Sequence, residues 1–277
     1  DRTMRIFIAG GTGAVGVRMV PLLVAAGHEV YGSTRHEAGC EALAAMGATG
    51  IVMDPLVAQS VHDAVAKAGV RRFIAQSFGG GWTHERTGGW VKDETDPLID
   101  DPGKEARGSL AAIRHLESAV VSTGSTSGGT DLEGVVLRYG NFYGPGNATS
   151  REGALGEMLR KGKMPVVGGG SGVWSFVHID DVASATVAAL DRGAPGIYNI
   201  VDDEPAPVNQ WIPLLAEEVG GRNPMRLPAW LARPLIGEFG VALMTSVRGS
   251  SNAKAKRELG WTPSYATWRE GFRTGIG

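Results

Sequence analysis

Three glycines spaced three residues apart carry the strongest chemical signal in this 277-residue chain. Gly10, Gly13 and Gly16 follow the short apolar run "RIFIA" and precede residues 14–26, which favour a helix. Such a turn lets the backbone approach a pyrophosphate, while the helix N-terminus supplies free N–H groups and a positive dipole. A glycine-rich turn without a ligand is the weaker alternative. The predicted cofactor-binding turn consists of Gly10, Gly11, Thr12, Gly13, Ala14, Val15 and Gly16.

The end of the next expected strand predicts which dinucleotide binds. Enzymes that use NAD place an acid there, on the ribose 2′-hydroxyl. This chain reads "YGSTRH", with Ser33 or Thr34 in the place of the acid and Arg35 directly after. A guanidinium without a carboxylate favours the 2′-phosphate of NADP, with NAD as the alternative cofactor and a solvated Arg35 as the structural alternative. Asp54, which ends the third expected strand, is expected to contact adenine, or else to form a turn before Pro55.

A glycine-flanked loop, "GGGWTHERTGGW", carries candidates for acid–base chemistry. It follows the fourth expected strand, and ligands bind at the carboxyl ends of strands in open α/β sheets. His84 titrates near neutrality and Glu85 adjoins it, so both are candidate catalytic residues. Tyr143 and Asn141, in "GNFYGPG", follow another strand and are expected to face the same crevice. The alternatives are a solvated loop for His84 and a cleft-shaping role for Tyr143.

Strand and helix patterns alternate along most of the chain. This alternation predicts an α/β fold with a Rossmann-like, doubly wound parallel sheet. Residues 122–130 have the composition of a flexible surface loop. Expected strands are 5–9, 28–34, 49–54, 71–77, 134–140 and 196–201, and expected helices include 14–26, 41–47, 58–69 and 104–121.

These features, together with "LRYGNFYGPG", "FVHIDDVA", "GIYNIVDDEP" and "KRELGWTP", resemble the extended short-chain dehydrogenase/reductase family, the NAD(P)-dependent epimerase/dehydratase group. The resemblance runs nearly end to end. It implies a Rossmann dinucleotide-binding domain at residues 1–144, joined by 174–202. It also implies a smaller C-terminal substrate lobe at 145–173 and 203–277, with substrate between the two.

The proton machinery of that family is missing. The resemblance implies a Tyr-x-x-x-Lys pair on the helix at 104–121, and a serine or threonine after the preceding strand. The lysine lowers the pKa of the tyrosine, which then exchanges a proton. This chain has tyrosine only at 31, 139, 143, 198 and 265. If Glu117 matches the acid that often follows the lysine, the two positions fall on Ser109 and Ile113. Ser77 is the candidate hydroxyl, although the strict position is Phe78.

Two further departures concern the sheet and the substrate. Relatives have a helix, a strand and another helix between the equivalents of Asp54 and Arg71, where this chain has room for one helix. Either a βα unit is lost or part of the natural chain is not represented. Trp174 stands where relatives that act on nucleotide sugars often carry a phosphate-binding arginine. With the apolar segment 227–244, it favours an apolar or polyketide-like substrate, and Trp174 and Asn141 are the candidate substrate-binding residues.

Composition excludes several classes of partner. Lys and Arg number 27 against 29 Asp and Glu, so the net charge of −2 and the lack of a basic block argue against nucleic acid and anionic membranes. Cys40 is the only cysteine, which fits a cytoplasmic location. No metal-ligand spacing and no membrane span are recognised. Self-association is expected through Leu110, Ile113, Leu116 and Val120, unless this stripe faces the sheet.

Three functions remain open. The first is an NADP-dependent oxidoreductase of a small apolar molecule with an altered proton donor. The second is a non-redox isomerase, dehydratase or cyclase on the same scaffold. The third is a nucleotide-sensing protein without turnover. The glycine turn is compatible with all three, and the missing tyrosine and lysine weaken the first. The apolar lobe and the loop around His84 favour an enzyme over a sensor.

Overall fold

The computed structural model describes residues 3–53, 70–122 and 132–277. Its first unit is a parallel three-stranded sheet in the order β1 (Arg5–Ile8), β2 (Glu29–Thr34) and β3 (Thr49–Val52). Helices α1 (Gly16–Ala25) and α2 (Glu37–Ala45) belong to this unit, and α2 packs against β2 and β3. The predictions for Asp54, for a helix at 58–69 and for a loop at 122–130 lie wholly or almost wholly outside the described residues.

A second parallel sheet has the order β11 (Gly196–Ile200), β6 (Glu133–Tyr139) and β4 (Arg72–Phe78). Helix α4 (Arg107–Ser122) packs on it. Leu116 and Val120 lie in one apolar cluster with Ala75 and Val136 of the strands. Part of the stripe predicted for self-association therefore faces the sheet, and self-association itself stays a prediction.

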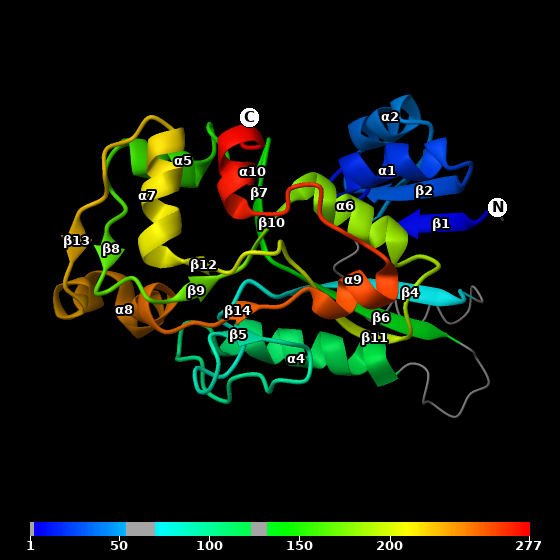
Figure 1. Cartoon of the computed structure of the whole chain (residues 1–277). Helices are drawn as coiled ribbons and strands as arrows, with labels where there is room; N and C mark the ends of the chain where they lie inside the picture. Colours follow the sequence, from blue (N-terminus) through cyan, green and yellow to red (C-terminus); the bar gives the residue numbers. More distant parts are fainter. Residues whose placement is uncertain (1–2, 54–69, 123–131) are drawn as a thin grey trace.

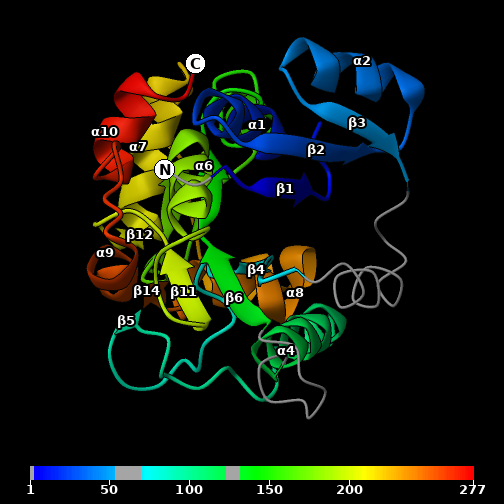
Figure 2. The same cartoon turned by 90° about the vertical axis from the view of Figure 1, so that its right-hand side faces the viewer.

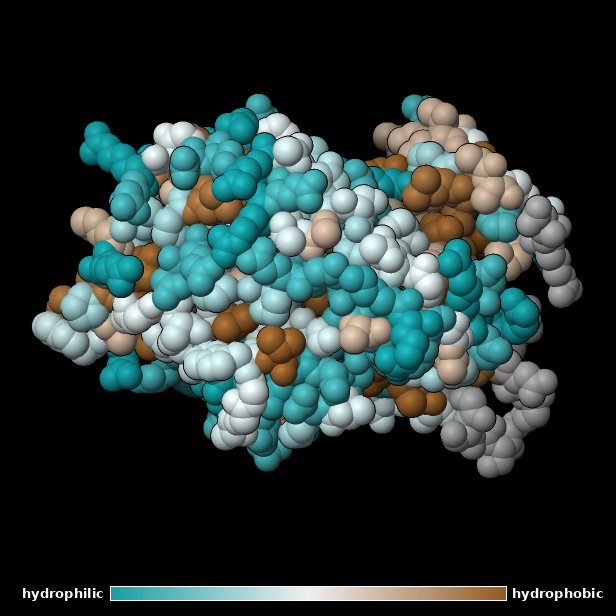
Figure 3. Space-filling model, viewed as in Figure 1, coloured by the Kyte–Doolittle hydropathy of each residue, from teal (hydrophilic) through white to brown (hydrophobic). Residues whose placement is uncertain are grey.

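The two sheets do not join among the described residues, because β1 and β4 have no ladder between them. Figures 1 and 2 show β1 standing apart from β4. Parallel sheets are normally covered on both faces, yet Phe7 on β1 is 48% exposed and Val52 on β3 is 52% exposed. Figure 3 shows hydrophobic residues at the surface of this first unit. The interruption agrees with the short connection between Asp54 and Arg71, where either a βα unit is lost or part of the natural chain is not represented.

Helix α6 (Ile179–Ala188) connects the first unit to the remainder, since α1 packs against it. The Arg18 Nε donates to Asp180 Oδ1 at 2.8 Å, and Arg18 Nη2 donates to the main-chain oxygen of Pro145 at 2.7 Å. Asp180 is exposed, so this ion pair contributes at most about 1 kcal/mol. Packing between α1 and α6 is the main link.

The C-terminal lobe is built around an aromatic core that includes Tyr143, Phe176, Trp211, Trp268 and Phe272, all fully buried. Leu259 and Trp261, which the predicted boundaries assign to the lobe, pack with residues of β6, β11 and α6. The remaining strands are short: β5 (Val91–Lys92), β7 (Asn141–Tyr143), β8 (Val166–Val167), β9 (Val173–Trp174), β10 (Phe176–His178), β12 (Ala206–Pro207), β13 (Arg226–Leu227) and β14 (Gly249–Ser250). The remaining helices are α5 (Ala154–Arg160), α7 (Val208–Glu218), α8 (Ala229–Thr245), α9 (Ala253–Leu259) and α10 (Trp268–Thr274).

Candidate active site

The glycine turn between β1 and α1 is shaped for close approach by a ligand. Gly10 has a φ of +80°, which side-chain-bearing residues rarely adopt. A Cβ on Gly16 would lie 2.5 Å from the carbonyl oxygen of Gly11, so this helix start tolerates only glycine. Thr12, Gly13 and Ala14 are exposed at the tip of the turn. The backbone thus offers an open cradle before a helix N-terminus, which fits a pyrophosphate.

The end of β2 carries Ser33 and Thr34, followed by Arg35, and no carboxylate. Ser33 is buried, and its hydroxyl accepts a hydrogen bond from Gly10 N at 2.8 Å. Its carbonyl oxygen accepts another from Gly11 N at 2.9 Å. Ser33 therefore braces the glycine turn, and Arg35 lies exposed just beyond the strand. The glycine turn and Arg35 are the residues that would hold a dinucleotide phosphate.

Helix α4 carries Ser109 and Ile113, the two positions at which the resemblance places the tyrosine and lysine. Ser109 is exposed and Ile113 is half-buried. One turn further on, the buried Glu117 accepts hydrogen bonds from Arg138 Nε at 2.8 Å and from Arg138 Nη2 at 2.6 Å. Ser77 donates its hydroxyl to the same carboxylate at 2.7 Å. The predicted catalytic hydroxyl of Ser77 is thus committed to a buried ion pair.

His84 lies in a different environment from the one expected. Its side chain is fully buried, and its backbone bridges that of Leu98. Neither ring nitrogen has a hydrogen-bond partner in the described structure. Burial, and secondarily the charge of Arg138, lower the pKa of His84 to about 4. At neutral pH this imidazole is therefore uncharged and keeps one ring N–H. The acid–base role of His84 stays a prediction.

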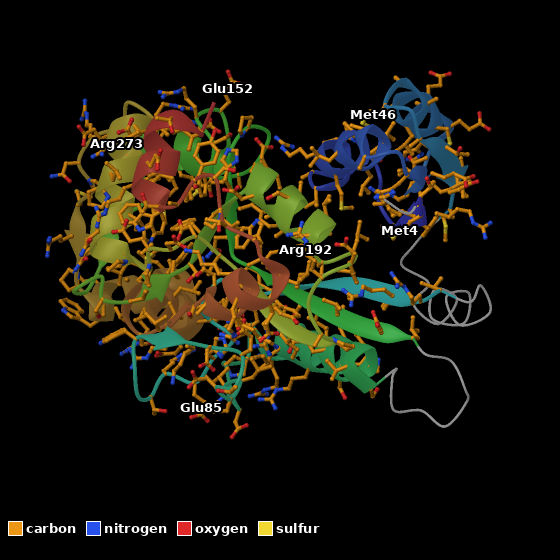
Figure 4. The ribbon with its side chains drawn as sticks, turned by 45° about the vertical axis from the view of Figure 1, so that its right-hand side comes forward. Met4, Met46, Glu85, Glu152, Arg192 and Arg273 are labelled. Carbon is orange, nitrogen blue, oxygen red and sulfur yellow. The ribbon has the colours of Figure 1, made fainter. Side chains whose placement is uncertain are left out.

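Glu85 and Tyr143 do not share a crevice. Figure 4 shows Glu85 at the rim of the molecule, pointing outward. Tyr143 is fully buried in the aromatic core of the lobe, where its hydroxyl has no partner among described residues. Burial, with the charges of Asp202 and Asp181, raises the pKa of Tyr143 far above its usual value. The predicted crevice lined by both side chains is therefore wrong, because β7 carries Tyr143 into the core.

The two candidate substrate-binding residues have structural partners. Asn141 Nδ2 donates to the main-chain oxygens of Gly80 at 3.1 Å and Ser175 at 3.0 Å. Trp174 is half-buried, donates to the main-chain oxygen of Leu243 at 2.8 Å and packs on Trp211 at 4.9 Å. Both hold the C-terminal lobe to the strand ends. Their roles with substrate stay predictions.

Sequence reasoning missed a buried polar layer across the second sheet. Ser77, Arg138 and Asn199 stand in register on neighbouring strands and are all buried. Arg138 Nη1 and both side-chain polar atoms of Asn199 have no partner in the described residues. No spacing signal marks this layer, because its members come from three strands. The residues that the structure describes contain no cluster of metal ligands and no helix long and apolar enough to cross a membrane.

Comparison with known proteins places these features in context. Residues 111–201 match the NAD dependent epimerase/dehydratase family. A 3-diazoavenalumate denitrifying reductase from a Streptomyces species is 34% identical over 310 residues, with 97% of this chain and 99% of the relative covered. That alignment is longer than this chain, so the relative carries stretches that the chain lacks.

Solved structures show the same fold. The Thermus thermophilus UDP-glucose 4-epimerase in complex with NAD has a TM-score of 0.65 at 25% identity, covering 99% of this chain and 98% of that one. A human epimerase family protein with NADPH has a TM-score of 0.66 at 20% identity, covering 99% of each chain. The structural neighbours therefore include binders of either cofactor.

Proposed function

Because this chain belongs to the NAD-dependent epimerase/dehydratase family, we propose that it is an NADPH-dependent reductase whose acceptor takes a hydride without a proton from the enzyme. The observation that carries the proposal is helix α4. If Glu117 matches the acid that often follows the lysine in relatives, Ser109 and Ile113 occupy the positions of the tyrosine and lysine that would exchange a proton, and α4 contains neither residue type. A reductase without this tyrosine and lysine needs an acceptor that can take a hydride without also taking a proton from the enzyme.

The residues around the cofactor turn support NADPH. The exposed backbone of Thr12, Gly13 and Ala14 would bind the pyrophosphate, and Arg35 would bind the 2′-phosphate. When bound, NADPH supplies a hydride. Ser33 keeps the turn in shape through its two hydrogen bonds to Gly10 and Gly11.

A diazonium group is a hydride acceptor that needs no proton from the enzyme. The Streptomyces relative is named as a denitrifying reductase of a diazo compound. When hydride adds to a carbon that bears N₂⁺, a C–H bond forms and the C–N bond breaks. The C–N electron pair leaves with N₂, so the charges cancel and no proton is consumed. Reduction of a ketone instead leaves an alkoxide that must be protonated, a step worth roughly 10²- to 10⁴-fold when an acid is positioned for it.

Turnover with 3-diazoavenalumate tests the proposal. We expect one NADPH oxidised and one N₂ released per product, above the rate without protein, and no reaction with a simple ketone. Gly13→Asp, which places a negative charge against the pyrophosphate, is expected to abolish the reaction. Robust NADPH oxidation with a ketone or a sugar nucleotide, or no reaction with the diazo compound, would contradict it.

A further inference from the structure

Two arginines from distant parts of the chain meet beside the loop that follows β4. Arg248 donates a hydrogen bond to the main-chain oxygen of Arg86, and its guanidinium lies 3.8 Å from the centre of the Trp90 ring. Four of their guanidinium nitrogens are buried without a partner in the described part of the chain: Nε and Nη2 of Arg86, and Nε and Nη1 of Arg248. Burial lowers the pKa of Arg86, but a guanidinium stays charged in proteins.

Acidic residues nearby do not neutralise these two arginines. A cavity of about 320 Å³ has Arg86 in its wall, together with Asp101, Arg233 and Glu238. Glu238 pairs with Arg233 at 2.7 Å. Asp101 pairs with Arg107 at 3.3 Å. Each acid thus already has its own arginine. Within the described residues Arg86 and Arg248 are left as cations without an acidic partner.

Buried donors without acceptors are costly, at roughly 1–3 kcal/mol each and more for charged groups. Native structures rarely leave them so unless a ligand or water completes the site. A carboxylate is the natural acceptor for an arginine, because its two oxygens match the fork of N–H groups. The cavity wall therefore points to an anionic ligand group.

Aromatic side chains pack together near this part of the chain, although none of them lines the cavity. Phe239 follows the wall residue Glu238, and its ring meets that of Trp82 edge-on at 5.5 Å. Trp82 in turn packs against Phe78 at 5.9 Å. The wall also includes Pro102 and Gly103, just before the start of α4, and Thr245 and Ser246 at the end of α8. The anion would thus sit between the lobe and the helix that carries Ser109.

We propose that this cavity binds the carboxylate of a small aromatic acid through Arg86. Arg248 does not line the cavity, but it donates to the main-chain oxygen of Arg86 and adds a second positive charge beside it. The volume lies at the lower end of the range for ligand pockets, roughly 300–1,000 Å³, so it suits a small acid better than a sugar nucleotide. The part of the inference that takes this acid to be the reductase's substrate rests on the proposed function. As a binding site it stands on the cavity and on Arg86 in its wall, whose Nε and Nη2 are buried without a partner among the described residues.

Calorimetry with 4-hydroxycinnamate and its methyl ester, without NADPH, tests the site. The acid is expected to bind at least tenfold more tightly than the ester. Arg86→Gln should weaken binding of the acid at least tenfold and leave the ester unchanged, and Arg86→Lys should retain part of the preference. Arg233→Gln is the matched control, because this arginine lines the same cavity but is paired with Glu238, and it should change either affinity less than twofold.

Equal affinity for acid and ester, or equal effects of Arg86→Gln and Arg233→Gln, would overturn the proposal. UDP-glucose binding that depends on Arg86 would do the same, since it would assign the arginines to a diphosphate. Circular dichroism checks that Arg86→Gln is folded. If it is not, the acid-to-ester ratio of the unchanged protein and of Arg86→Lys decides. Calorimetry measures binding and not turnover, so the two proposals can fail separately. If the protein binds the acid but transfers no hydride in the turnover assay, only the proposed function is contradicted.

Discussion

Glu117 and Arg138 form a buried two-point ion pair that fixes helix α4 on strand β6, with N–O distances of 2.8 and 2.6 Å. Ser77 on β4 donates to the same carboxylate. Helix α4 is therefore held in place by three hydrogen bonds, one turn after Ile113. The helix itself contains neither tyrosine nor lysine.

Removing the ion pair between Glu117 and Arg138 should lower the free energy of unfolding. Glu117→Gln removes the charge opposite a buried guanidinium, and losing one member of a buried pair costs roughly 3–5 kcal/mol. Urea denaturation is expected to show a loss of this size in the free energy of unfolding. Glu157→Gln, which breaks an exposed pair with Lys161, should change it by less than about 1 kcal/mol. Similar effects of both variants would refute a structural role for the buried pair.

The burial of His84 should make the free energy of unfolding fall as the pH is lowered. Its pKa is about 4 when folded and about 6.5 when unfolded, so the unfolded chain binds the extra proton between these values. Stability contributed by neutral His84 is full above pH 6.5 and falls as pH drops towards 4. Between pH 7 and 5 the loss should be about 2 kcal/mol. His84→Gln should remove this slope, and the exposed His115→Gln should keep it. An unchanged slope in His84→Gln would reject the assignment.

Tyr143→Phe separates a core role from a catalytic one. The Tyr143 hydroxyl is buried without a partner in the described structure, so its removal should raise the free energy of unfolding by about 1 kcal/mol and leave kcat/KM within twofold. Tyr139→Phe is the control, because Tyr139 shares a hydrogen bond of 2.7 Å with Thr186 and should lose stability. A hundredfold fall in kcat for Tyr143→Phe would restore it to the catalytic site.

Arg35→Ala tests the choice of cofactor. Arg35 is exposed beyond β2, in the place of a 2′-phosphate contact. The dissociation constant for NADPH should rise at least tenfold, while that for NADH should change less than twofold. Arg5→Ala, at the far end of β1, should alter neither. Equal affinities for the two cofactors, unaffected by Arg35→Ala, would remove the preference for NADP.

Local patterns predicted the fold well, because they depend on neighbours in sequence. The glycine turn lies between β1 and α1 as expected, and α4 spans Arg107–Ser122 against the expected 104–121. The interrupted sheet was also foreseeable, since the chain between Asp54 and Arg71 is too short for another βα unit.

The environments of the candidate catalytic side chains could not be predicted from sequence, because distant segments decide their burial. His84 is covered through its bridge to Leu98, and Tyr143 packs against Phe272 of the last helix at 5.4 Å. Arg86 gains its importance from Arg248, 162 positions away. Nothing in the local pattern around these residues signals those contacts.

The source of the new hydrogen tests the central claim, a hydride transfer that needs no proton relay, most directly. The protein is given the diazo substrate with NADPH deuterated at the transferring position in H₂O, and with ordinary NADPH in D₂O. The account predicts one deuterium at the carbon that lost nitrogen in the first reaction and none there in the second. Deuterium taken from D₂O at that carbon, or product formed without NADPH oxidation, would contradict it.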